Sequence, residues 1–194
     1  CACLVGSEMC IRDREYAAML ADARALLAAG TDGLAFGFLH ADGTVDEART
    51  REFVALCGEK EAVFHRAFDV TPDRDAAMQT LIACGVKRVL TSGGACDAPT
   101  GKDELRRLQA AYGEQIEILP GGGINTQNVG EFINETGTHS VHASARSLRH
   151  DTSVCGNPEI FFGGKLNGVG IPENEYKVTD SALVRNVVAA IEAR

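Results

Sequence analysis

Hydrophobic positions along the chain alternate between a helical spacing and short, mostly apolar runs. Apolar residues recur every three or four positions between Tyr16 and Leu27, which predicts an amphipathic helix that Gly30 ends. The same spacing, together with Pro72 just after a capping Thr71, predicts further helices at residues 46–57, 72–84, 102–112, 126–135 and 181–193. The short apolar runs are typical of buried strands and cover residues 33–39, 61–69, 86–92, 115–119 and 140–146.

A helix followed by five strand–helix pairs indicates an α/β fold with a parallel sheet and helices outside it. Five such strands fit either an open doubly wound sheet or part of a barrel. No strand leads into a helix through Gly-x-Gly-x-x-Gly, so a dinucleotide site has no support. The run Gly121–Ile124 is rich in glycine but lacks the Lys-Ser/Thr of a P-loop.

The first thirteen residues carry a pattern of a different kind. Residues 4–13 read LVGSEMCIRD, which matches one reading frame of a transposon-end adapter used to prepare sequencing libraries. We therefore expect residues 1–13 to be a non-native segment that packs poorly, with residues 14–194 forming the domain. The alternative is a genuine polar N-terminal arm.

Several short motifs resemble the strand ends of the CutC family, in the order in which that family carries them. They are DGLAFGFL at 32–39, VFHRAFD at 63–69, RVLTSGG at 88–94, ILPGGGI at 118–124, VHASAR at 141–146 and NEYKVTD at 174–180. The resemblance runs from about Glu15 to the end of the chain.

The resemblance implies a TIM (β/α)8 barrel truncated to about its last five βα units. A whole barrel needs about 250 residues, whereas about 180 follow the N-terminal segment. We expect such an open fragment to be aggregation-prone. The resemblance also implies a cytoplasmic protein linked to copper homeostasis and copper ion binding, but it supplies no reaction, so whether the protein is an enzyme stays open.

Composition narrows the classes of partner. The chain has 194 residues, 45% of them apolar and 24% charged, with a net charge of −8 and a pI near 5.1. An acidic surface repels phosphate backbones and anionic lipid, so nucleic acid and membranes are not expected partners. No run of 18 apolar residues and no signal-peptide pattern is present, so no membrane span is expected. The expected partner is a small molecule or, as the resemblance implies, a copper ion in the cytoplasm, with a homo-oligomer possible.

Candidate chemistry gathers at the ends of the predicted strands, which form the working face of a TIM barrel. Alternation along the strands is expected to turn His65, Glu117 and His142 into the lumen. The predicted catalytic residues are His65, Asp69, Glu117 and His142. The predicted ligand-binding residues are Arg66, Ser92, Gly93, Gly94, Gly121, Gly122, Gly123, Asn125, Ser144 and Arg146.

Three hypotheses about function follow from these residues. The first is a small anionic or phosphorylated ligand held by glycine N–H groups and arginines, with His65 as an acid or base. The second is copper handling without catalysis, with Cys96 and Cys155 as weakly supported metal ligands. The third is that an open barrel does nothing. The alternative for the three lumen residues is a hydrogen-bonded polar core. The alternative for the glycines is that they only allow sharp turns of the chain.

Overall fold

The computed structural model describes residues 2–4, 13–153, 165–166, 169–170 and 174–193. Its centre is a five-stranded parallel sheet whose spatial order follows the sequence. This order confirms a barrel arc and excludes a doubly wound sheet, in which the order reverses. The strands are β1 (Ala2–Leu4), β2 (Gly33–Phe36), β3 (Glu61–Phe64), β4 (Arg88–Thr91) and β5 (Glu117–Pro120).

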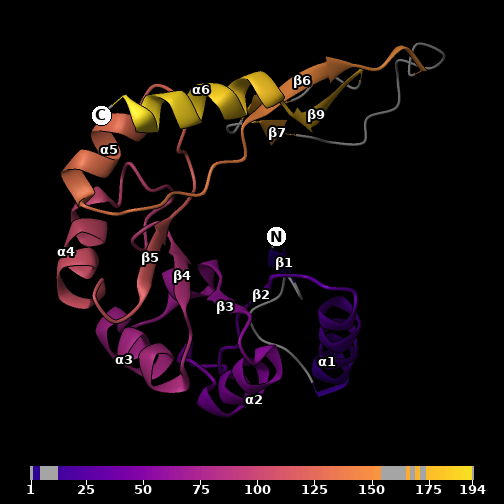
Figure 1. Ribbon diagram of the computed structural model, residues 1–194, viewed down its shortest axis with the longest axis vertical. Coiled ribbons are helices and arrows are strands. Elements are labelled where there is room, and N and C mark those ends of the chain that lie inside the picture. The colour runs from indigo at the N-terminus through magenta and orange to yellow at the C-terminus, as the bar shows by residue number, and fades with distance from the viewer. Residues whose placement is uncertain (1, 5–12, 154–164, 167–168, 171–173, 194) are drawn as a thin grey trace.

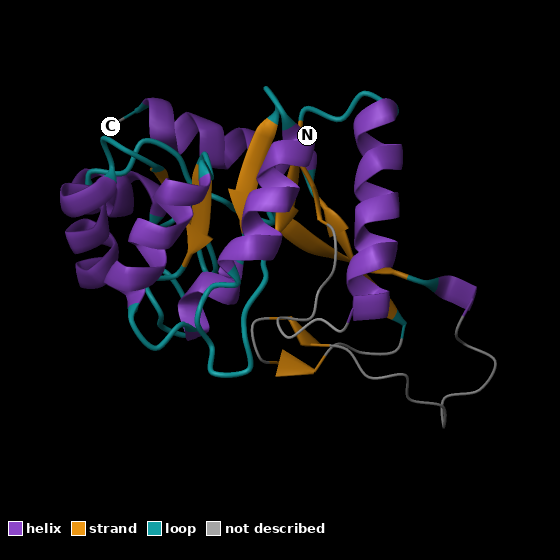
Figure 2. Cartoon of the chain, turned by 90° about the horizontal axis from the view of Figure 1, so that it is seen from below, coloured by secondary structure: helices purple, strands orange, loops and turns teal. Residues whose placement is uncertain are grey.

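Helices surround the strands on the outer side of the arc, and the arc is open on one side (Figure 1). Figure 2 shows the same arrangement from below. The helices are α1 (Asp13–Ala28), α2 (Glu47–Cys57), α3 (Arg74–Cys84), α4 (Lys102–Tyr112), α5 (Val129–Thr136) and α6 (Ser181–Glu192). Most of their bounds agree with the hydrophobic spacing, although α5 begins three residues later than predicted and α3 is capped by Asp73 instead of Thr71.

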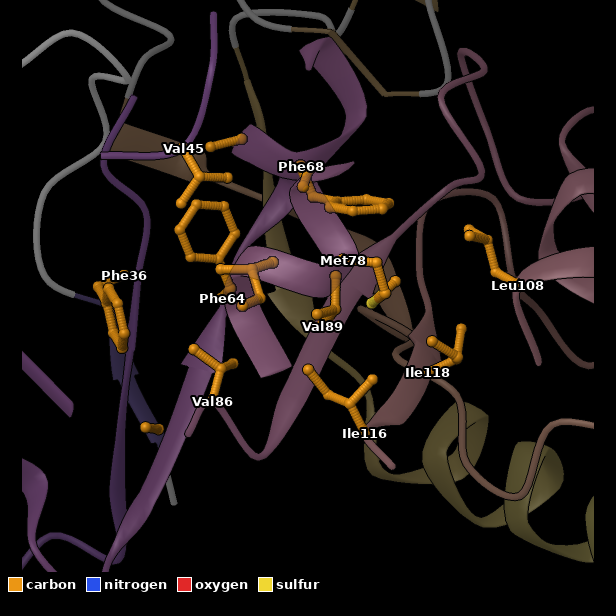
Figure 3. Packing of buried hydrophobic residues seen from close by; sticks show 14 of the residues in the cluster. Phe36, Val45, Phe64, Phe68, Met78, Val86, Val89, Leu108, Ile116 and Ile118 are labelled. Atoms are coloured by element: carbon orange, nitrogen blue, oxygen red, sulfur yellow. The ribbon is translucent and has the colours of Figure 1, made fainter. Parts of the chain in front are cut away.

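The core lies between the strands and the helices. Phe36 is fully buried, and its ring lies 4.6 Å from that of Phe53 on α2, centroid to centroid. Along β5 and the residue before it, Ile116 and Ile118 are buried on the helix side, while Glu117 and Leu119 stay partly exposed on the inner side, as the alternation predicted. Side chains from neighbouring strands and helices meet in this layer (Figure 3).

All five predicted strands are shorter than expected, and two of these differences change the candidate site. The chain leaves β3 after Phe64 and forms a 3₁₀ helix, η1 (Arg66–Val70), whose first turn is capped by the His65 ring. The alternation of side chains between the two faces of the strand therefore ends at His65. Asp69 reaches the site from the 3₁₀ helix and not from the predicted strand. The predicted strand at 140–146 makes only one parallel bridge, between Gly121 and His142.

The chain turns away from the sheet at Ala145 and forms an antiparallel hairpin. Ala145 has φ = +43°, a left-handed conformation that ends an extended strand. The hairpin pairs β6 (Arg146–His150) with β9 (Glu175–Thr179), inside the region expected to be a loop. A shorter pair, β7 (Lys165–Leu166) with β8 (Val169–Gly170), lies between them in sequence.

The N-terminus differs from the expected poorly packed segment in one respect. Residues Ala2–Leu4 form β1 and pair in parallel with β2. An open sheet edge offers backbone N–H and C=O groups to any extended chain, so this pairing needs no particular side chains. Residues 5–12 and the side chains of residues 1–13 lie outside the described part, and so does the expectation about their burial.

Candidate functional site

The carboxylate of Asp69 joins the loops that follow β3 and β4. Its Oδ1 accepts hydrogen bonds from Thr91 Oγ1 at 2.5 Å, Ser92 N at 3.0 Å and Gly94 N at 3.1 Å. Its Oδ2 accepts from Arg66 Nε at 2.6 Å and lies 2.9 Å from Ser92 Oγ. Burial alone raises the pKa of Asp69, but these hydrogen bonds outweigh it and hold the pKa below its usual value. Asp69 is therefore a charged acceptor that fastens the Ser92–Gly94 turn.

Arg66 is oriented by the same network. Besides its ion pair with Asp69, it donates from Nη2 to Ser92 Oγ at 2.6 Å and to the Ala95 carbonyl at 3.3 Å. Its third nitrogen, Nη1, lies 3.2 Å from the point where a side chain on Gly122 would begin. The guanidinium thus reaches from the loop after β3 to the loop after β5.

His65 is buried at the C-terminal end of β3. Its Nδ1 accepts a hydrogen bond from Ala67 N at 3.1 Å, so the neutral ring carries its proton on Nε2. Burial lowers the pKa of His65 below its ordinary value. The ring fits only because residue 37 is glycine: a Cβ on Gly37 would overlap His65 Cε1. His65 is therefore a neutral side chain held in one tautomer.

A cavity of about 160 Å³ lies beside the loop that follows β5. Polar groups on its wall come from Asn125, Thr126, Ser144 and Arg146, and Gly123 contributes backbone. The rest of the wall is Ile124, Ala145, Leu183 and Val187. Four predicted ligand-binding residues thus share one cavity, since Gly123, Asn125, Ser144 and Arg146 all line it.

Backbone geometry at this cavity is unusual at three positions. Gly122 and Gly123 have φ of +95° and +79°, which glycine adopts without strain. Ala145 is the one described residue other than glycine with a positive φ. Such strain persists where surrounding structure imposes it, and it concentrates at functional sites. The strained residue stands between Ser144 and Arg146, both on the cavity wall.

The predicted lumen cluster of His65, Glu117 and His142 does not form a connected group. Glu117 begins β5, whereas His142 pairs with Gly121, four residues farther on, which is about 13 Å along a strand. Glu117 instead forms an ion pair with Arg88 at 2.6 Å and accepts a hydrogen bond from Ser140 Oγ. Alternation along the strands correctly predicted the face to which these side chains point, but it does not fix their position along the strand. The prediction that Glu117 and His142 lie close together was therefore wrong.

The structure does not assemble the predicted metal ligands. Cys96 is exposed, with its sulfur 3.8 Å from Thr100 Oγ1, and Cys155 lies outside the described residues. Within the described part, no group of three or more His, Cys, Asp or Glu side chains is placed to hold a metal ion. Cys57 and Cys84 are buried, and burial raises the pKa of both thiols.

Two residues of this site were not singled out from the sequence. Gly37 stands alone inside an apolar run, and an isolated glycine in such a run signals close approach of another group, so it could have been found. Ala145 has no such signal, because an alanine carries no mark of a left-handed backbone.

The sequential parallel arc and the polar loops at the C-terminal strand ends define this chain as a TIM-barrel-type α/β protein. The model of the CutC family matches residues 5–147, and the chain belongs to this family. The match begins inside the segment expected to be non-native, whose origin stays a proposal.

Relatives agree with this assignment. A CutC family protein of Treponema denticola is 42% identical over 177 residues, which cover 91% of this chain and 71% of that protein. The copper homeostasis protein cutC homolog of Homo sapiens is 36% identical and matches 95% of this chain. The chain spans about two thirds of the human relative's length, 66%.

A solved structure supports the fold. The crystal structure of the CutC protein from Streptococcus agalactiae superposes with a TM-score of 0.68 at 25% identity, over 72% of this chain and 70% of that one. No helix in the described part of the chain is long and apolar enough to span a membrane.

Proposed function

We propose that the face at the C-terminal strand ends binds a small anionic ligand, such as a phosphorylated metabolite. The observation that carries this proposal is the cavity beside Gly123, Ser144 and Arg146. In TIM barrels, the loops after the last two strands commonly bind phosphate. Here these loops are the one after β5 and the one after the bridge at His142.

Each polar group on the cavity wall suits an anion. Arg146 would supply charge-assisted hydrogen bonds, and Gly123 lets backbone N–H groups approach closely, with Gly122 beside it in the same loop. Asn125 and Thr126 add side-chain donors, while Ile124 and Val187 would contact the carbon part of a ligand. Arg66 and the Ser92–Gly94 turn form the neighbouring loops of the same face.

Catalysis is a further proposal. His65 is the candidate acid or base. Because Ala67 N already donates to its Nδ1, Nε2 is the ring atom that would exchange a proton with a ligand. Among the other candidates, His142 is exposed beside Gly121, whereas Asp69 and Glu117 are engaged in hydrogen bonds. These contacts favour a role for Asp69 and Glu117 in holding the site.

Calorimetric titration with inorganic phosphate tests the binding proposal. We expect saturable binding that Arg146→Gln weakens by about tenfold, the worth of a charge-assisted hydrogen bond. Arg185→Gln is the control, because Arg185 is exposed on α6 but does not line the cavity. Equal binding by the Arg146 variant and the unmodified chain would contradict the proposal.

A role in copper homeostasis, with direct copper binding, is the second candidate. The names of the human and mouse relatives favour it. Cu(I) prefers sulfur ligands, and Cys96 is exposed on a loop of the same face. Titration with Cu(I) should show saturable binding that changing both Cys96 and Cys155 to Ser weakens. Unchanged stoichiometry and affinity in that variant would remove both as ligands.

Location and assembly also belong to the proposal. A net charge of −8 favours a small-molecule or metal partner over nucleic acid or an anionic membrane, and a cytoplasmic site of action fits reduced thiols at Cys57, Cys84 and Cys96. The open edges of the arc would favour a homo-oligomer.

A further inference from the structure

We infer that the anion site continues onto one face of the β6–β9 hairpin, where Lys177 supplies a second cation for a ligand with two phosphate groups. The inference rests on the proposed function, because Arg146 belongs to both the cavity and the hairpin.

The register of the hairpin puts Arg146 and Lys177 on the same face. Arg146 pairs with Thr179 and Leu148 pairs with Lys177. Directly opposite residues share a face in an antiparallel pair, as do residues two apart on one strand. Arg146 and Lys177 are therefore diagonal neighbours, with Cβ atoms about 7 Å apart. Arg149, between Leu148 and His150, points to the other face.

Both cations are available to a ligand. Arg146 is exposed and Lys177 is half-buried, and no carboxylate in the described part of the chain forms an ion pair with either. The nearby carboxylate of Asp180 is already used, since it accepts from Ala182 N at 2.8 Å as the cap of α6. Two adjacent cations with no ion-pair partner among the described residues are notable in a chain with a net charge of −8.

The same face also limits the size of the ligand. Glu175 lies two residues from Lys177 on β9 and pairs with His150, so a carboxylate follows the two cations. A third phosphate would meet this negative charge. Leu148, 38% exposed and opposite Lys177, offers an apolar contact between the two ends. A diphosphate or a small bisphosphorylated molecule therefore fits better than a longer polyanion.

Inorganic pyrophosphate and orthophosphate are the probes that separate the two cations. The intact chain should bind pyrophosphate about tenfold more tightly than orthophosphate, because only pyrophosphate reaches Lys177. Lys177→Gln should weaken pyrophosphate binding by roughly 5- to 10-fold and leave orthophosphate within about twofold. Lys177→Arg should keep the preference for pyrophosphate.

Arg149→Gln is the matched control, because it removes the same charge from the same hairpin on the opposite face. It should leave both affinities unchanged, and far-ultraviolet circular dichroism should show that every variant keeps its helices. An equal loss in the Lys177 and Arg149 variants would mean general charge attraction and would overturn the inference.

The remaining outcomes distinguish this inference from the proposed function. If Arg146→Gln weakens both probes while Lys177→Gln weakens neither, the second cation is wrong and the anion cavity stands. If Arg146→Gln changes neither affinity, the anion cavity itself is wrong, and the inference falls with it.

Discussion

At the scale of single residues, Asp69 is the residue of the site whose charged side chain is buried and needs several hydrogen-bond donors. Its side chain is only 8% exposed, yet it stays charged because backbone and side-chain donors surround it. Removing an acceptor of this kind leaves several buried donors without a partner, which costs more than the bonds themselves contribute. Asp69 therefore stabilises the loops that carry Arg66 and Ser92.

Asp69→Asn should lower the free energy of unfolding by about 2–4 kcal/mol, since an amide turns a donor toward Arg66 Nε and cannot balance its charge. Chemical denaturation monitored by circular dichroism measures this loss. Asp75→Asn is the control, because Asp75 pairs with Arg107 at the surface, and its loss should be below about 1 kcal/mol. Equal losses in the two variants would contradict the role given to Asp69.

His65 and Asp69 both contribute to the pH dependence of stability. Both have a pKa that is lowered in the folded chain, from ordinary values of 6.5 and 3.8. The unfolded chain therefore takes up protons first as the pH falls, so stability is complete above pH 6.5 and declines below it. Asp69 adds a second decline below pH 3.8, together with other carboxylates whose pKa is lowered, such as Asp75 and Asp97.

His65→Asn should remove the first decline, because an Asn side chain still accepts from Ala67 N but does not titrate. Denaturant midpoints measured between pH 7.5 and about 4.5 test this. His150→Gln, an exposed histidine on β6, should leave the decline in place. A steady midpoint across this range in the unmodified chain would show that His65 titrates as it does in water.

At the scale of elements, the two ends of the arc differ in how firmly they are held. On one side, β1 adds only three residues to β2, with no requirement on side chains. On the other, the chain after Gly121 makes a single bridge and then leaves the sheet for the β6–β9 hairpin. The strands β2 to β5 between them carry the core.

Deleting residues 1–12 should change the free energy of unfolding by about 1 kcal/mol or less, because a three-residue edge strand is a minor part of the core. Thermal unfolding of the shortened and full chains makes the comparison. A loss of several kcal/mol would show that residues 1–12 pack as a native strand, against the proposed adapter origin of this segment.

At the scale of the whole molecule, the fold is an arc that does not close on itself (Figure 1). A closed barrel pairs every strand on both sides. Among the described residues, neither β1 nor the chain at His142 has a strand paired on its outer side. Apolar side chains are also exposed on the hairpin and on α6, among them Tyr176, Val184 and Val188. Open edges and exposed apolar groups both favour association.

We therefore expect the 194-residue chain to self-associate, with an apparent mass in light scattering that rises with protein concentration. Fusing the chain to the part of a relative that it does not cover should reduce this association and give a monodisperse protein. A monomeric mass for the chain alone at every concentration would contradict this expectation.

Hydrophobic spacing by itself determined the order and kind of the main elements. The helix at Lys102–Tyr112 and the inward side of Glu117 followed from local periodicity, which depends only on neighbouring residues. The strand motifs likewise placed Asp69, Ser92 and Gly123 at one face of a barrel. Local spacing left an open sheet and a barrel both possible, and the resemblance of these motifs to the CutC family indicated the barrel.

Tertiary structure decided what the residues of that face do. Spacing could not show that Asp69 reaches its partners from a 3₁₀ turn, or that Glu117 lies about four residues below His142, because side-chain parity fixes direction and not height. Ala145 adopts its left-handed backbone only because the hairpin and α6 hold the chain on both sides. The pairing of Leu148 with Lys177 spans 29 residues, so the second cation beside Arg146 was set by long-range register, which local sequence does not encode.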